Sequence, residues 1–204
     1  MATGPVVLHY IDIGRRGRGE VVTLFLKDAG IEVKEIRYPY DDTWKQISEK
    51  LRQQGITRTG QVPALEYKGS IITQHIPILR YLARELGAYD GETSYDKYIV
   101  DAVADIYIDW RSESVAEFHS TAPEYKTVFV PKYYDLIAKY YSDREGPYLL
   151  GDKMSYVDFA VYQSIDHDRS IGALPSPLPG PLVMLEKALE SRPNIAGYIK
   201  ATKQ

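Results

Sequence analysis

The 204-residue chain contains no cysteine. This absence excludes disulfide bonds, cysteine-ligated metal sites and a cysteine nucleophile. The chain also lacks any run of about 18 continuous apolar residues, so we expect no membrane-spanning helix. The N-terminus shows neither the basic start nor the long apolar run of a secretory signal. We therefore expect a cytoplasmic protein with no membrane partner.

An excess of positive charge is also missing. Lys and Arg number 25 against 28 Asp and Glu, which gives a formal net charge of −3 and a pI of about 5.8. Because nucleic-acid-binding domains are usually basic, we expect no nucleic-acid partner. His9, His119 and His167 are scattered without the spacing of metal ligands, and we predict no metal site.

Tyrosine, by contrast, is abundant, with 18 residues. Buried tyrosines commonly pack in a core or an interface and keep the hydroxyl at a polar edge. Some of them could instead line a cavity for apolar, aromatic ligands. The count alone favours packing and leaves the second interpretation open.

Apolar alternation and turn residues predict an α/β domain in residues 1–87. Strand patterns alternate with helical ones, and Gly30 and Gly87 supply helix stops. The Lys68-Gly69 pair predicts a hairpin turn between two short strands. The expected elements are strands at 6–9, 31–38, 64–67 and 70–73, helices at 21–29 and 76–86, and a weakly helical stretch at 41–54. Their order, βαβ and then ββα, matches a thioredoxin-like domain.

A polar linker at 89–93 separates this domain from a second half in which every pattern is helical. Apolar residues recur at helical spacing in four segments, and prolines separate the segments. The four apolar faces are Ile99, Ala102, Val103, Ile106 and Trp110; Phe129, Tyr133, Leu136, Ile137 and Tyr140; Val157, Ala160, Val161, Ser164 and Ile165; and Leu182, Leu185, Ala188 and Leu189. We therefore predict an all-α bundle at 93–204. Ser155 and Asp158 predict a capping box at the start of the third helix.

Short motifs in the first domain indicate a binding site for a small peptide. Tyr10 ends the first strand, and Val62-Pro63 stands between a loop and a strand, where a proline marks an edge or a special turn. Gln74 follows Pro63 by eleven residues, at a helix N-terminus where free amides and the helix dipole favour an anion. An extended backbone beside such a helix can bind the backbone and carboxylate of a peptide.

The order of these motifs resembles that of the cytosolic glutathione S-transferases of the tyrosine type, such as the sigma, pi and mu classes. The resemblance runs over nearly the whole chain. It implies an α/β thioredoxin-like N-terminal domain followed by an all-α helical bundle domain with the acceptor-substrate pocket. It also implies a detoxifying transferase, active as a homodimer, that joins the thiolate of its co-substrate glutathione to a small apolar electrophile.

The resemblance assigns roles to individual residues. Tyr10 would be the catalytic residue, because a hydroxyl that donates to the sulfur stabilises the thiolate of a thiol with an ordinary pKa of about 8.5. Trp44 and Lys50 match the pi-like spacing of the residues that hold the glycine carboxylate. The backbone of Val62 would pair with the cysteinyl unit, just before a cis Pro63.

The other end of glutathione, the γ-glutamyl unit, has its own assignments. Gln74 and His75 would hold the γ-glutamyl carboxylate at the start of a helix. Asp109 falls where pi and sigma relatives place an aspartate that reaches across the dimer interface toward the γ-glutamyl amine. Arg18 and Gln61 complete the set of glutathione-binding residues that the resemblance implies.

The sequence departs from the family's pattern in two places. Arg16-Gly-Arg18 begins six residues after Tyr10 instead of the usual four, an apparent insertion at Gly14-Arg15. A loop amide or one of these arginines could therefore assist the sulfur, since a cation lowers the pKa of a thiol. His75 replaces the Ser or Thr of most relatives and could either donate to the carboxylate or crowd the pocket. Candidates for the acceptor pocket, which we do not assign, are Ile13, Tyr107, Arg111, Val115 and Tyr198.

The fold has more than one use. Sigma relatives include isomerases that make prostaglandin D, and the same fold serves as a non-catalytic interaction module in a translation elongation factor subunit and in lens crystallins. The motif residues favour an enzyme over an interaction module. The sequence does not distinguish a transferase from a glutathione-dependent isomerase or a peroxidase.

Overall fold

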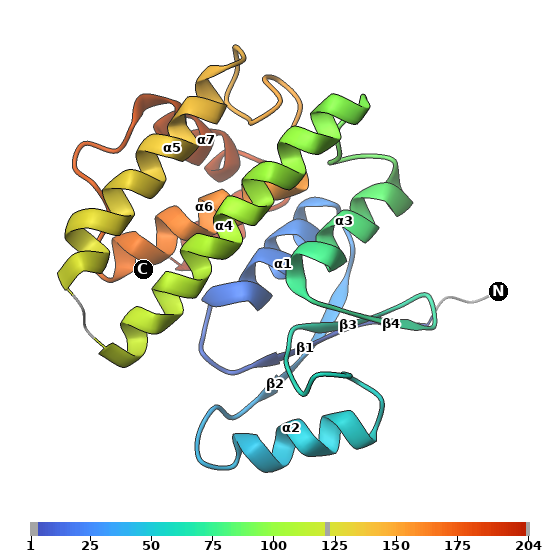
Figure 1. Cartoon of the computed structure of the whole chain (residues 1–204). Coiled ribbons are helices and arrows are strands. Elements are labelled where there is room, and N and C mark those ends of the chain that lie inside the picture. The colour runs from blue at the N-terminus through green and yellow to red at the C-terminus, as the bar shows by residue number, and fades with distance from the viewer. Residues whose placement is uncertain (1–3, 121–122, 203–204) are drawn as a thin grey trace. The chain divides into compact units, whose positions relative to one another are not determined.

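The computed structural model describes residues 4–120 and 123–202. The chain forms two compact units, one of Met1–Leu82 with Pro193–Gln204 and one of Ala83–Arg192. Figure 1 follows the chain through its elements. The domain boundaries expected from the sequence, 1–87 and 93–204, stay a prediction; the last helix groups with the first unit rather than with the bundle.

The first unit contains a four-stranded sheet in the order β2-β1-β3-β4, in which β1 and β2 are parallel and the other pairs antiparallel. Its strands are β1 (Val6–Ile11), β2 (Val33–Tyr38), β3 (Ala64–Tyr67) and β4 (Ser70–Thr73). Its helices are α1 (Gly17–Asp28), α2 (Trp44–Gln53), α8 (Ala196–Thr202) and all but the last turn of α3 (His75–Leu86), because the boundary between the units follows Leu82. Figure 1 shows α1 and α3 on one side of the sheet and α2 on the other. The predicted thioredoxin-like fold is confirmed.

The central strand β1 presents different side chains to the two faces of the sheet, because successive side chains of a strand alternate. Leu8 and Tyr10 are buried on the face that α1 covers. His9 points to the other face, where its ring bonds to Tyr38 at 2.7 Å and to Glu66 at 2.8 Å. Each of its two ring nitrogens thus has a polar partner, which is the structural role expected of this histidine.

The second unit is helical. It contains α4 (Ser94–Ser120), a π-helical turn η1 (Tyr125–Phe129), α5 (Val130–Ser142), α6 (Tyr156–Ser170) and α7 (Gly180–Glu190). Helix α6 is the centre of the bundle, with 12 of its 15 residues buried, as expected for a helix that is surrounded by others. The predicted capping box is present, and the Asp158 carboxylate accepts a bond of 2.6 Å from the backbone N–H of Ser155.

The buried face of α5 differs from the predicted one. The apolar pattern placed Leu136 inside, but 41% of this residue is exposed. Tyr134 and Tyr141 are buried instead, because their hydroxyls donate to two buried carboxylates of α6, Asp168 at 2.8 Å and Asp158 at 2.7 Å. Bonds to partners distant in sequence therefore decide the orientation of this helix.

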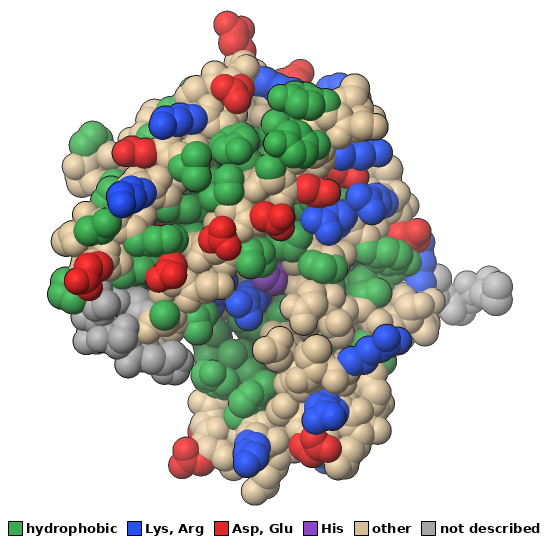
Figure 2. Space-filling view, in the orientation of Figure 1, with side chains coloured by type: hydrophobic (Ala, Val, Ile, Leu, Met, Phe, Trp, Pro, Cys, Tyr) green, Lys and Arg blue, Asp and Glu red, His purple; other side chains and the backbone are tan. Residues whose placement is uncertain are grey.

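The surface mixes charge and apolar side chains. Figure 2 shows acidic and basic side chains interspersed among hydrophobic ones on one face of the molecule. The most exposed aromatic rings among the described residues include Tyr95 and Tyr98 on α4, which are 65% and 59% exposed and whose ring centroids lie 5.8 Å apart. Among the described residues, no helix is both long enough and apolar enough to cross a membrane.

Candidate active site

Tyr10 lies one residue before the end of β1 and is 3% exposed. Its ring rests against the backbone of α1 at Gly19, where an added Cβ would lie 2.3 Å from a ring carbon. The guanidinium carbon of Arg37 lies 5.5 Å from the ring centroid, within the range of a cation–π contact. Gly19 and Arg37, which no sequence motif marks, thus contact the predicted catalytic side chain.

The loop between β1 and α1 carries the apparent insertion. Gly14 has a φ of +69°, a conformation that glycine adopts without steric cost. Arg15 donates from Nη1 to the carbonyl of Tyr198 at 2.8 Å, and its guanidinium carbon lies 3.9 Å from the centroid of the Tyr198 ring. Arg15 therefore binds the last helix, α8. Nε of half-buried Arg18 is, among the described residues, a buried donor with no hydrogen-bond partner.

Glu20 is a buried carboxylate in the first turn of α1, 5% exposed. It accepts a hydrogen bond of 3.0 Å from the hydroxyl of Tyr198. Burial raises the pKa of Glu20 from its ordinary value of 4.5 to about 7, against the opposing effects of Tyr198, Arg15 and Arg37. A carboxyl group that changes charge near neutral pH thus lies beside the loop that follows Tyr10.

The predicted residues for the glycine carboxylate both belong to α2. Trp44 is the first residue of the helix and is half-buried, with its ring 5.9 Å from that of Tyr40. Lys50 is exposed in the last turn. Asp41 accepts bonds from the N–H and the hydroxyl of Thr43, at 2.8 and 2.5 Å, and these bonds lower its pKa. This turn fixes the chain direction just before Trp44.

The segment before β3 has the expected backbone. The Val62-Pro63 peptide bond is cis, as the resemblance implied. Pro63 is buried, Val62 is half-buried and Gln61 is exposed. The buried hydroxyl of Thr57 donates to the carbonyl of Gln61 at 2.8 Å, so the loop itself fixes the backbone that leads into the cis bond.

The start of α3 shows an unusual backbone conformation. Gln74 is exposed and has a φ of +69°. A non-glycine residue in this region carries strain, and such residues cluster at functional sites. His75 follows as the first residue of α3 and is 3% exposed. The imidazole is thus buried in the fold, while the exposed Gln74 is the side chain of this pair that solvent reaches.

Asp109 belongs to the second unit, where it is exposed on α4. Every other predicted site residue belongs to the first unit. Two of the unassigned pocket candidates are buried inside the bundle: Tyr107 stacks on Trp110 at 5.5 Å and donates to Gln163 at 3.3 Å. Arg111 is 7% exposed and donates to Ser114 at 3.3 Å. Their surroundings are those of core residues.

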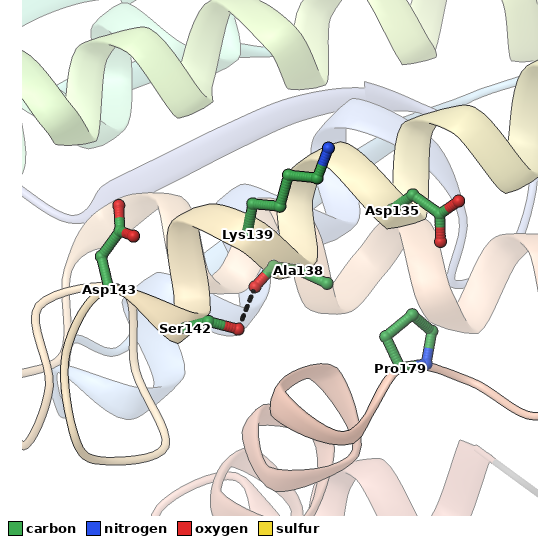
Figure 3. A pocket seen from close by; sticks show the side chains of 6 residues that line it. All are labelled: Asp135, Ala138, Lys139, Ser142, Asp143 and Pro179. Carbon is green, nitrogen blue, oxygen red and sulfur yellow. Dashed lines mark hydrogen bonds between the residues drawn. The ribbon is translucent and has the colours of Figure 1, made fainter.

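A shallow groove lies elsewhere in the bundle, along the outer surface of α5 near the start of α7. Figure 3 shows its lining side chains, in which Ser142 donates to the carbonyl of Ala138 at 2.8 Å. The groove is lined by Asp135, Ala138, Lys139, Ser142, Asp143 and Pro179. None of the predicted site residues lines it. His119 lies outside the residues whose side chains the structure describes. Among the side chains that are described, no group of three or more His, Asp or Glu residues is arranged to hold a metal ion.

A thioredoxin-like unit followed by a helical bundle, with a tyrosine at the end of β1 and a cis-proline before β3, defines a class of two-part enzymes. Family models agree with this class: the one described as "Glutathione S-transferase, N-terminal domain" matches residues 6–84, and the one described as "Glutathione S-transferase, C-terminal domain" matches residues 106–202. A curated relative, glutathione S-transferase 1 of Ascaris suum, is 30% identical over 206 residues, with 94% of each chain covered.

Solved structures give the same result. A glutathione S-transferase of Caenorhabditis elegans is 26% identical with a TM-score of 0.81, and the likeness covers 97% of this chain and 98% of that one. A prostaglandin synthase D of Nilaparvata lugens has a TM-score of 0.82 and 21% identity, again over 97% and 98% of the two chains; at that identity the likeness shows the fold alone. The chain belongs to the glutathione S-transferase family. The fold, the glutathione transferase function and the transferase enzyme class predicted from the sequence are confirmed.

Proposed function

We propose that this chain conjugates glutathione to small apolar electrophiles, with Tyr10 as the group that stabilises the thiolate. The observation that carries the proposal is Tyr10 itself, a buried tyrosine near the end of β1 whose ring lies against Gly19, with the guanidinium carbon of Arg37 5.5 Å from the ring centroid. In the reaction, the thiol of glutathione loses its proton to solvent and the thiolate attacks the electrophilic carbon. The new sulfur–carbon bond forms as the leaving group departs with its electron pair.

The binding of glutathione would use the other predicted residues of the first unit. Trp44 and Lys50 on α2 would hold the glycine carboxylate through a neutral donor and a charge-assisted pair. Val62 forms a cis peptide bond with Pro63 just before β3. Its backbone would pair with the cysteinyl unit. The strained Gln74 supports a role at the γ-glutamyl carboxylate.

His75, Gln61 and Arg18 have more limited roles in this proposal. Because the imidazole of His75 is buried, we propose that this residue contributes its backbone N–H at the start of α3. Gln61 is exposed beside the cis bond, and Arg18 has a buried donor nitrogen without a hydrogen-bond partner in the part of the chain that the structure describes. Both are available to polar groups of the ligand.

We also propose that the protein is a cytoplasmic homodimer with a role in detoxification. The exposed pair Tyr95 and Tyr98 on α4 supports self-association, since exposed aromatic surface often marks an interface. Asp109, exposed on the same helix, would reach the γ-glutamyl amine of the partner's glutathione. Light scattering of the purified chain tests the dimer, and a monomeric mass would contradict it.

The decisive experiment compares wild type with Tyr10→Phe for glutathione affinity and for conjugation of a chloronitrobenzene acceptor. We expect Tyr10→Phe to bind glutathione and to lose about 10²- to 10³-fold in kcat, the usual loss when one donor to a developing anion is removed. Tyr140→Phe, a half-buried tyrosine of α5, is the control for the loss of a phenol. Equal turnover by Tyr10→Phe and wild type would remove the catalytic role of Tyr10.

A further inference from the structure

Arg37 on β2 is the cation beside Tyr10. The parallel register pairs Tyr10 with Arg37 and Leu8 with Glu35, and side chains of paired residues in neighbouring strands share a face. Arg37 donates to Glu35 from Nε at 2.8 Å and from Nη2 at 2.5 Å. The guanidinium plane is therefore fixed by two charge-assisted bonds that converge on one carboxylate oxygen.

The carboxylate that fixes Arg37 is itself held. Thr23 on α1, which is fully buried, donates from its hydroxyl to the second oxygen of Glu35 at 2.9 Å. The chain of bonds thus runs from α1 through Glu35 to Arg37. Because each member is half-buried or buried, solvent screens these bonds less than it screens bonds between fully exposed groups.

The remaining nitrogen of Arg37 binds the loop that follows Tyr10. Nη1 donates to the carbonyls of Ile11 and Gly14, each at 3.3 Å. Ile11 is the residue next to Tyr10, and Gly14 belongs to the apparent insertion. Arg37 thus contacts the loop at two points and the Tyr10 ring at 5.5 Å, so one side chain restrains both.

We propose that Arg37 is a positioning residue for glutathione transfer, and this rests on the proposed role of Tyr10. Its guanidinium fixes the loop after Tyr10 through the carbonyls of Ile11 and Gly14 and holds the phenol ring against Gly19, so that the hydroxyl reaches the sulfur in one fixed orientation. Lysine cannot replace it, because a single ammonium does not reproduce the planar fork that binds Glu35 and the loop carbonyls together.

A purely structural ion pair is the competing interpretation, and the chain offers a matched control for it. Arg169 on α6 also binds one glutamate, Glu186, through two nitrogens. This pair lies in the helical unit and involves none of the predicted site residues. Arg169→Gln therefore removes the same kind of ion pair without touching the loop after Tyr10.

The test measures kcat, KM for glutathione, and the ultraviolet absorbance of the bound thiolate for full-length Arg37→Gln, Arg37→Lys and Arg169→Gln. We expect both Arg37 variants to lose about 10- to 100-fold in kcat, the scale of a misplaced catalytic group. KM for glutathione should stay within about threefold, because the residues that bind its two carboxylates are intact. The thiolate absorbance should fall in both Arg37 variants and stay at the wild-type level in Arg169→Gln.

Two further variants make every outcome informative. If Arg37→Gln does not fold, Glu35→Gln removes the charge that fixes the guanidinium and should give the same direction of change in kcat and absorbance. The proposal is overturned by a wild-type kcat and thiolate absorbance in the Arg37 variants, or in Glu35→Gln where Arg37→Gln does not fold. In that case an inactive Tyr10→Phe still leaves the proposed function standing. Full activity of Tyr10→Phe instead shows that the proposed role of Tyr10 has failed, and Arg37 with it.

Discussion

Glu20 changes charge in a range where most carboxylates are already ionised. Its pKa of about 7 in the folded chain exceeds its ordinary value of 4.5 because the group is buried. Among the described residues, Tyr198, Arg15, Arg37 and Glu35 are charged or titratable groups that act on its pKa. Between pH 4.5 and 7 the folded chain therefore holds a proton that the unfolded chain has released, and this proton uptake stabilises the fold at the acidic end of the range.

Burial of Glu20 should make the stability of the fold depend on pH between 4.5 and 7. As pH rises from 4.5 to 7, the Glu20 contribution to the free energy of unfolding should fall by up to about 3 kcal/mol. Glu20→Gln should remove this slope and be more stable than wild type at pH 8, since its amide oxygen still accepts the Tyr198 hydroxyl. Urea unfolding at several pH values measures the effect, with the exposed Glu32→Gln as the control. An unchanged difference between variant and wild type across the window would contradict the assignment.

Replacing Gly19 by alanine should disturb the Tyr10 ring. A methyl group there would lie 2.3 Å from the Tyr10 ring, and a contact this short forces the ring to move. We expect Gly19→Ala to lower kcat by about 10- to 100-fold. The helix itself should not suffer, because alanine favours helices over glycine by roughly 1 kcal/mol. Circular dichroism and kinetics separate the two effects, and Gly197→Ala on α8, where a Cβ meets nothing within 4 Å, is the control.

The sequence predicted some of these residues and missed others for an identifiable reason. Tyr10 and Pro63 stand in local motifs whose positions along the chain are enough to mark them. Arg37, Glu20 and Gly19 act through partners that the chain brings beside them only when β1, β2 and α1 assemble. The alternation of Glu35 and Arg37 on one face of β2 was the available signal, and it needed the strand register to become informative.

Helix α6 acts as an organising element through one buried carboxylate. Asp168 accepts hydrogen bonds from Trp110 on α4 at 2.9 Å, from Tyr125 in η1 at 2.7 Å and from Tyr134 on α5 at 2.8 Å. Burial raises its pKa, and these three donors oppose that rise. A single side chain thus joins four elements of the bundle, which also explains part of the high tyrosine content.

Replacing the Asp168 carboxylate should lower the stability of the fold without changing the residues of the predicted active site. In Asp168→Asn, the amide NH2 replaces an oxygen that accepts bonds, so at least one buried donor loses its acceptor. We expect the free energy of unfolding to fall by about 2–4 kcal/mol. The exposed Asp135→Asn on α5 is the control, and chemical denaturation is the measurement. A difference from the control below about 1 kcal/mol would show that Asp168 does not hold the bundle together.

Features of the elements that depend on neighbouring residues could be predicted, and those that depend on distant partners could not. The hairpin of β3 and β4 and the capping box of α6 were predicted because turn and cap residues act on their immediate neighbours. The predicted face of α5 is confirmed at Tyr133 and Ile137 and was wrong at Leu136, because Leu136 fits an apolar pattern as well as Tyr134 does. The π-helical turn at Tyr125–Phe129 leaves no mark in the spacing of apolar residues that would separate it from an ordinary helix.

Ligand binding gives the prediction for the whole molecule. A ligand that binds only the folded chain stabilises it, by about 2.7 kcal/mol at 100 times its Kd, so glutathione should raise Tm by several degrees. Lys50→Ala should weaken glutathione binding about 10- to 100-fold, the usual effect of losing a charge-assisted hydrogen bond. Lys45→Ala, an exposed neighbour on α2, should keep the wild-type shift. Equal shifts in both variants would remove Lys50 from the site.

The last helix, α8, completes the core of a unit that begins at the N-terminus. Asn194 donates to the carbonyl of Asp28 at 2.8 Å, and Ile195 and Ile199 are buried in the first unit. Domains usually fold in order as they leave the ribosome. Here the thioredoxin-like unit lacks part of its core until residues 193–202 have been synthesised, after the whole helical bundle. The bundle can therefore finish folding first, although its residues come second in the chain.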